Sequence, residues 1–200
     1  MGASRRHRGL AGAGFVIALI CSCVTDAFPQ VARPSLDVPN AAGVGIEIFP
    51  ATTLSAGTKA QLRITTGKMG YLIVVNVDAA GKLKQVFPNA DYVRTEGASA
   101  LSNQIKPGQV ITIPEPGNPY TGFAFVVSPP IGAAMAVALL CDQPVQLVDL
   151  PDVPSSMLGR ADAVKYVAEA ADALQIVADN VRARLTKPKW SFAAVFYRVE

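Results

Sequence analysis

The sequence predicts a mainly β fold with one long α-helix, an antiparallel β-sandwich-like domain that ends in a C-terminal helix and a closing strand. Three observations indicate this fold: seven short strand-forming runs between residues 45 and 142, Gly or Pro at most joints, and a helical apolar stripe after residue 155. Short strands separated by turn residues are typical of sandwiches and barrels. The chain of 200 residues is long enough for one domain with a sizeable core.

The run from Tyr71 to Val77, YLIVVNV, predicts a strand buried on both faces, because its β-branched and aromatic side chains include only one polar residue, Asn76. A turn follows in which Gly81 can adopt a positive φ. The alternating run KLKQVFP then predicts a more exposed strand. Together the two runs indicate a hairpin with one core strand.

The remaining runs share short length and strand-forming composition. AQLRITT alternates apolar Leu62 and Ile64 with polar neighbours, as a half-buried strand does. The alanine-rich run at 133–142 has little room for a helix between Gly132 and Pro144, so we expect a strand. The seven predicted strands are 45–50, 60–66, 71–78, 82–88, 109–114, 123–129 and 133–142.

A single helix is expected over about 155–186. Its apolar side chains recur at spacings of three and four, and Pro188 stops it. The stripe fits a coiled-coil seam for a partner helix or a helix packed on the flank of its own sheet. Small alanines at two of its positions favour the second arrangement, a helix packed on the flank of its own sheet. The stripe is Val164, Val167, Ala171, Leu174, Ala178, Val181 and Leu185.

The closing run at 190–199, WSFAAVFYRV, is apolar on both faces. An exposed edge strand of this composition would invite aggregation. We therefore expect it to lie between or beside earlier strands.

The first 22 residues predict a signal peptide of the lipoprotein type. Three arginines precede an apolar stretch that is too short to span a bilayer. The stretch Ile20-Cys21-Ser22-Cys23 resembles a bacterial lipobox, which makes Cys23 the expected lipidation site. The alternative is cleavage after Ala27, which would release a soluble periplasmic protein.

Residues 23–43 predict an extended tether, because Pro29, Pro34 and Pro39 recur at five-residue intervals. Residues 44–200 would then form a single β-rich domain. By resemblance to known sorting signals, Val24 after the cysteine favours the outer membrane. The expected location is the cell envelope, lipid-anchored and facing the periplasm.

Charge and residue inventory exclude several function classes. Three of the 18 basic residues precede residue 23, which leaves 15 basic and 15 acidic side chains and no basic patch for nucleic acid. The only histidine is His7, inside the signal, so histidine-based catalytic and metal sites are unavailable to the mature chain. Cys141 lies in an apolar run and is expected to be a buried, inert thiol. We expect no cofactor, no metal and no catalytic residue.

Loop residues remain as candidates for binding. Long loops are often where binding occurs, and the candidate binding-loop residues are Asp78, Asn89, Asp91, Tyr92 and Asn103. Carboxylates at Asp78, Asp91, Glu96 and Glu115 offer the alternative of a glycosidase-like hydrolase, although loop acids are more often turn formers. Nothing resembles a spaced calcium-binding loop.

The region from Gly70 to about Pro144 resembles the bacterial family of domain of unknown function 4384. The resemblance rests on Gly70-Tyr71-Leu72, Asp78 to Gly81-Lys82, Phe87-Pro88-Asn89, Asn103, Ile105, Gly108, Ile113-Pro114, and Pro129-Pro130 with Gly132. It implies a β-rich, non-catalytic accessory domain of exported proteins and lipoproteins, and it brings no catalytic residues.

These expectations converge on a non-catalytic envelope lipoprotein that acts as a binding or scaffolding module. Its expected partners are the membrane, through the N-terminal lipid, and another envelope protein, with no nucleic acid. The alternative is an envelope hydrolase that uses loop carboxylates.

Overall fold

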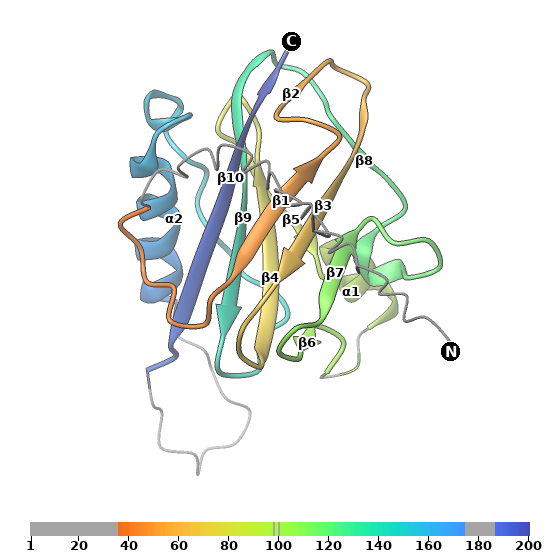
Figure 1. The fold of residues 1–200 in the computed structure, drawn as a ribbon, viewed down its shortest axis with the longest axis vertical. Helices are drawn as coiled ribbons and strands as arrows, with labels where there is room; N and C mark the ends of the chain where they lie inside the picture. The colour runs from red at the N-terminus through yellow and green to blue at the C-terminus, as the bar shows by residue number, and fades with distance from the viewer. Residues whose placement is uncertain (1–35, 98, 100, 175–186) are drawn as a thin grey trace, which may run out of the picture. The chain divides into compact units, whose positions relative to one another are not determined.

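The structure is a computed structural model that describes residues 36–97, 99, 101–174 and 187–200 (Figure 1). The chain divides into two units, Met1–Arg33 and Pro34–Glu200, and all described residues belong to the second. The described elements are β1 (Gly45–Phe49), β2 (Thr53–Leu54), β3 (Lys59–Thr65), β4 (Gly70–Val77), β5 (Leu83–Phe87), α1 (Ala90–Glu96), β6 (Gln104–Ile105), β7 (Val110–Ile113), η1 (Pro119–Thr121), β8 (Phe125–Val126), β9 (Gly132–Cys141), η2 (Ser155–Met157), α2 (Ala161–Ala173) and β10 (Trp190–Val199).

The larger sheet has the strand order β2-β10-β9-β4-β5, with β6 paired to β4. The long strand β9 lies at its centre and pairs antiparallel with β10 on one side and β4 on the other. Only β2 runs parallel to its neighbour, β10. The closing strand therefore lies between earlier strands, as predicted, and the sheet is mixed rather than purely antiparallel.

The smaller sheet has the order β1-β3-β7, with β8 also paired to β3. Burial alternates residue by residue along β3, with its apolar side chains inward. This is the pattern of a strand with one face on a core and one face in water.

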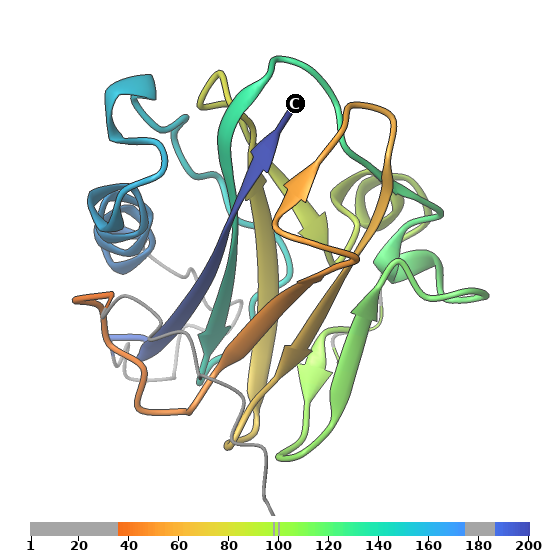
Figure 2. The same ribbon diagram turned by 45° about the horizontal axis from the view of Figure 1, so that its top comes forward.

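The two sheets pack face to face around one apolar cluster (Figure 2). Ile46, Leu62 and Ile64 come from the smaller sheet, and Leu72 and Val74 from the larger one. Alternate side chains of β9 on this face are small, Ala134, Ala136 and Ala138. The second face of the larger sheet is also buried, so the elements form three layers.

Helix α2 covers that second face (Figures 1 and 2). Ile73, Val75 and Val77 of β4 and Met135, Val137 and Leu139 of β9 meet the helix residues Ala163, Val164, Val167 and Ala171. Val74 and Val75 are therefore both fully buried, on opposite faces. The prediction of a core strand buried on both faces is confirmed.

The segment between β9 and α2 is held against the sheet by one side chain and one backbone carbonyl of the β4–β5 hairpin. Gln85 Nε2 donates to the Gln146 carbonyl at 2.8 Å, and Gln85 Oε1 accepts from the Val148 amide at 3.1 Å. The Val153 amide donates to the Gly81 carbonyl at 2.8 Å. These bonds place Leu150 and Val153 in the apolar cluster beneath the helix.

The mainly β fold is confirmed, and each of the seven predicted runs contains a strand. The run 123–129 forms only the two-residue β8, because its pairing with β3 is limited to Lys59 and Ala60. Two short strands, β2 and β6, and the helix α1 were not predicted. Asn89 caps α1 by accepting from the Tyr92 amide at 3.0 Å, in a segment that we expected to be loop.

The prediction of one long helix over 155–186 is not confirmed. Helix α2 has 13 residues and ends at Ala173, with Leu174 in an extended conformation. It begins only at Ala161, because Gly159 has a φ of +75° and Arg160 is extended. The expected residues 175–186 lie outside the described part of the chain. Among the described residues, the stripe packs on the flank of its own sheet.

The end of the segment expected to be a tether lies along β10. The Phe192 amide donates to the Pro39 carbonyl at 2.8 Å, and the Ala42 amide donates to Ser191 Oγ at 3.1 Å. Ala42 is buried in the core between the sheets. Residues 23–35 of the expected tether lie outside the described residues.

Candidate functional site

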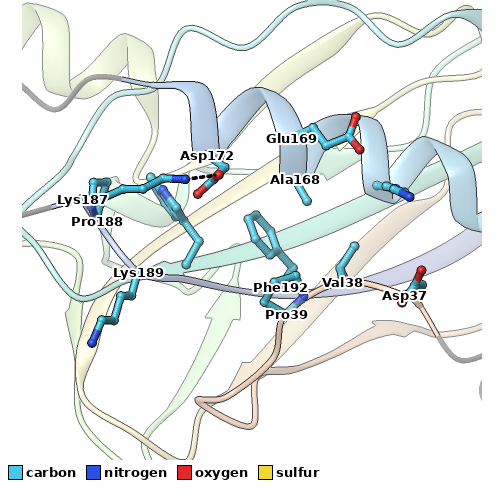
Figure 3. A pocket seen from close by; sticks show the side chains of 12 residues that line it. Asp37, Val38, Pro39, Ala168, Glu169, Asp172, Lys187, Pro188, Lys189 and Phe192 are labelled. Carbon is cyan, nitrogen blue, oxygen red and sulfur yellow. Dashed lines mark hydrogen bonds and ion pairs between the residues drawn. The ribbon is translucent and has the colours of Figure 1, made fainter.

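A pocket of about 550 Å³ lies between α2 and the first residues of β10, with residues 37–39 closing a third side. Figure 3 shows its side chains, with Glu169 and Asp172 on the helix above Phe192, Pro39 and Val38. Ligand pockets of drug-sized molecules have volumes of roughly 300–1,000 Å³. The pocket is therefore large enough for a molecule of that size.

The floor of the pocket is apolar and partly aromatic. The rings of Trp190 and Phe192 are stacked, with centroids 6.3 Å apart and an interplanar angle of 25°. Both side chains are buried, with 6% and 2% of their surface exposed. The other apolar lining residues are Val38, Pro39, Ala168 and Pro188.

One of the residues that line the pocket carries a buried donor without an acceptor. The Trp190 Nε1 atom is buried and has no hydrogen-bond partner among the described residues. An indole N–H can only donate, and leaving such a group unpaired costs about 1–3 kcal/mol. The fold therefore leaves one donor of the lining residue Trp190 unsatisfied.

The rim carries equal numbers of opposite charges, three carboxylates and three ammonium groups. Asp172 and Lys187 form an ion pair of 2.5 Å between side chains that remain half or more exposed. Among the described residues, no ion pair joins Asp37, Glu169, Lys165 or Lys189 to another side chain. The charges on the rim therefore balance and favour neither anions nor cations.

Local structure explains how three distant segments meet here. The lining residues of α2 follow at helical spacing, from Lys165 through Ala168 and Glu169 to Asp172, beside the buried stripe. Residues 37–39 are held by the Pro39–Phe192 backbone bond. The start of β10 is fixed by the Lys189 amide, which donates to Asp142 Oδ1 at 2.9 Å.

The five predicted binding-loop residues do not form one site. Asp78 lies in the turn before β5, where its carboxylate accepts from the amides of Ala80 and Lys82 at 2.8 and 2.9 Å. Asn89 and Asp91 lie beyond the other end of β5, at the start of α1. Asp78 is a turn former, the ordinary role of such an acid.

Three of these residues gather around the start of α1. Asn89 caps the helix, Asp91 lies 3.6 Å from Lys84 Nζ, and the Tyr92 ring meets Tyr120 edge to face at 5.2 Å. Asp91 is 71% exposed at its side chain. Each of the three has a partner that explains it structurally.

Asn103 is a buried structural residue. Its Nδ2 donates to the carbonyls of Leu72 at 3.0 Å and Val145 at 2.6 Å, so it joins β4 to the segment after β9. Its Oδ1 is buried without a partner among the described residues. Among the four carboxylates considered for hydrolysis, Glu115 lies in a separate turn, where it accepts from Asn118.

The two cysteines singled out in the sequence differ in status. Cys23 lies outside the described residues. Cys141 is a free, fully buried thiol of β9, and burial raises its pKa to about 11. The expected burial of this thiol is therefore confirmed, and a thiol that stays protonated is a poor nucleophile.

Metal-ligating clusters and spanning helices are both missing from the described part of the chain. No group of three or more His, Cys, Asp or Glu residues in those ranges could hold a metal ion. Within the same ranges, no helix is long and apolar enough to cross a membrane.

Sequence reasoning did not find the pocket. Its lining comes from residues 37–39, 165–172 and 187–192, and no local pattern links them. One signal was available: Trp190, the only tryptophan of the chain, starts a strand that follows an amphipathic helix. Tryptophan is enriched at interfaces, because its ring is apolar and its N–H is a donor.

Comparison with known families supports the resemblance drawn from the sequence. Residues 53–144 match the family described as Domain of unknown function (DUF4384). The matched region runs from β2 to the residues just after β9, and the pocket lies outside it. No curated protein matches the chain, and no solved structure matches it either.

Proposed function

We propose that this chain is a non-catalytic lipoprotein of the cell envelope whose β-rich unit is a binding module. The observation that carries the binding role is the pocket between α2 and β10, with its apolar floor and unpartnered indole N–H. Sites for small molecules are mostly apolar with a few placed polar groups. The floor of the pocket has that composition, and the charged groups lie on its rim.

The proposed location in the cell envelope rests on the first residues of the sequence. A basic stretch, a short apolar stretch and the Ile20–Cys23 lipobox support lipidation of Cys23, facing the periplasm, at the outer membrane. A bacterial lipoprotein carries more than one acyl chain, which is enough for a stable anchor without a spanning helix. Cleavage after Ala27, giving a soluble periplasmic protein, is the alternative address.

Lipidation is tested by metabolic labelling with a fatty acid. The wild-type chain should carry label and stay with membranes, whereas Cys23→Ala should lose both properties and keep the same thermal unfolding. Cys21→Ala is the matched control and should keep its label. Label that persists in Cys23→Ala would contradict the proposal that Cys23 carries the lipid anchor.

The binding role is tested by what the protein carries from the envelope. Protein purified from membranes should yield a small organic molecule by mass spectrometry of a solvent extract. Ala168→Phe fills the pocket from α2 and should deplete that molecule, whereas Ala161→Phe, on an exposed position of the same helix, should not. Equal extracts from all three proteins would leave another envelope protein as the partner of a scaffolding module.

A further inference from the structure

We propose that the pocket between α2 and β10 binds an uncharged, drug-sized apolar molecule that offers a hydrogen-bond acceptor to Trp190 Nε1. This inference rests on the proposed binding function and names its ligand class. Three features of the described residues carry it, namely the floor, the unpartnered donor and the balance of charge.

The floor selects an apolar body. Phe192, Pro39 and Val38 lie together beneath the helix in Figure 3, and the Trp190 ring stacks on Phe192. Apolar area leaves water when a ring or a chain lies on these side chains. A strongly hydrated molecule would gain nothing from them.

The indole N–H selects an acceptor. Trp190 pairs with Cys141 of β9, and the backbone of the preceding residue, Lys189, pairs with Asp142. The Trp190 side chain is more than nine-tenths buried, yet Nε1 has no partner within the described residues. A carbonyl oxygen of a ligand on the floor would complete this donor, and a pure hydrocarbon would leave it unpaired.

The rim selects against net charge. Three carboxylates and three ammonium groups surround the opening, and Figure 3 shows Lys187 directed at Asp172 on the helix. The lining therefore carries no excess of positive charge for an anion and no excess of negative charge for a cation. With no excess of either sign, a charged ligand loses hydration without a matching gain.

The inference is tested with four probes that share a naphthalene body. They are 2-acetylnaphthalene, which adds a carbonyl acceptor, 2-ethylnaphthalene, which adds none, 2-naphthoate, an anion, and 2-(aminomethyl)naphthalene, a cation. The full chain carrying Cys23→Ala is used without detergent, so that no lipid or detergent competes. Because Trp190 is the only tryptophan, a single indole N–H signal in a proton–nitrogen NMR spectrum reports on the pocket.

We expect 2-acetylnaphthalene to move the indole signal downfield and to bind about tenfold more tightly than 2-ethylnaphthalene, since about 1.4 kcal/mol corresponds to tenfold. The two charged probes should bind no more tightly than the ketone. Equal affinity of the ketone and the hydrocarbon would contradict the proposed hydrogen bond to Trp190 Nε1. Tighter binding of either ion would contradict the proposal that the ligand is uncharged. In both cases the pocket would remain a binding site.

If none of the probes moves the indole signal, the pocket is not a ligand site. The proposed binding function would then lose the observation on which it rests. Ala168→Phe should abolish binding while Ala161→Phe leaves it unchanged. Should Ala168→Phe fail to fold, Trp190→Phe is the second variant, with probe affinities measured by calorimetry. It separates the role of the indole N–H from that of the aromatic ring. It should remove the preference for the ketone and leave hydrocarbon binding within about twofold, because the ring remains and the donor is lost.

Discussion

The Tyr197 hydroxyl of β10 donates a hydrogen bond of 2.9 Å to Asn76 Oδ1 of β4, across the strand that separates them. Neighbouring strands are about 4.8 Å apart, so β10 and β4 lie roughly twice that distance apart and the two side chains bridge the gap. The ring can reach because β9 presents only Ala134 and Ala136 at this level of the sandwich face. Asn76, the single polar residue of the core strand, therefore supplies the acceptor, and the small alanines of β9 leave room for the Tyr197 ring to reach it.

Tyr197→Phe tests this contact. Removal of the hydroxyl leaves Asn76 without its donor in a partly buried position, and we expect a loss of about 0.5–1.5 kcal/mol in the free energy of unfolding. Urea unfolding measures it. Asn76→Ala and the double variant complete a cycle, in which strictly additive losses would show that the two residues are not coupled.

Val74→Asp tests the inner layer. The side chain is fully buried between the sheets, and an unpaired carboxylate there costs several kcal/mol. That is comparable with the lower end of the total stability of a domain, about 5–15 kcal/mol. We expect a protein that does not fold at ambient temperature by circular dichroism. Wild-type melting of this variant would mean that β4 is not a core strand.

Gly81→Ala tests how the segment before α2 is held. A Cβ at this position would lie 2.0 Å from the Val153 carbonyl oxygen, and Gly81 has a φ of +86°. Gly57→Ala is a matched control, since Gly57 has a φ of +88° and no atom lies within 4 Å of the place that its Cβ would take. The control should lose about 1 kcal/mol from backbone strain alone.

The Gly81 variant should lose distinctly more than this control in thermal unfolding, because Val153 must also move. Equal losses in the two variants would show that the contact between Gly81 and Val153 contributes nothing to stability.

Cys141 gives a prediction for pH. Burial raises the pKa of its thiol from 9.0 to about 11, so the unfolded chain releases this proton first. The contribution to stability is fully present below pH 9 and is lost as the pH rises towards 11. Iodoacetamide should therefore label Cys141 slowly in the folded protein and quickly in urea, as measured by peptide mass spectrometry. Equal rates at about pH 8, below the ordinary thiol pKa, would contradict a buried thiol.

Local patterns were sufficient to predict the long strands and the packing of the helix. Strand β3 alternates apolar and polar residues because one of its faces is buried. Strand β4 carries apolar residues on both sides because both of its faces are buried, and the structure shows both patterns of burial. Strand β10 was predicted over its full range, residues 190–199, because an all-apolar strand at this length has few alternatives to the sheet interior.

Tertiary context decided the remaining elements. Strands β2 and β6 have two residues each and exist only through their partners, β10 and β4. Helix α1 depends on the Asn89 cap, a feature that also fits a turn. The start of α2 was placed too early because Gly159 at positive φ interrupts the helical stretch. The pocket requires three segments far apart in sequence, so only the fold could reveal it.

The position of α2 and β10 outside the matched region has a consequence for where this module can be cut. A fragment of residues 53–144 would keep β4 and β9 but lose β1, β10 and the helix. The face that carries Ile73, Val75, Val137 and Leu139 would then meet water, and β9 would present a ten-residue unpaired edge. Apolar open edges promote self-association. An expression fragment that stays soluble should therefore begin before β1 and extend to Glu200, well beyond both ends of the matched region.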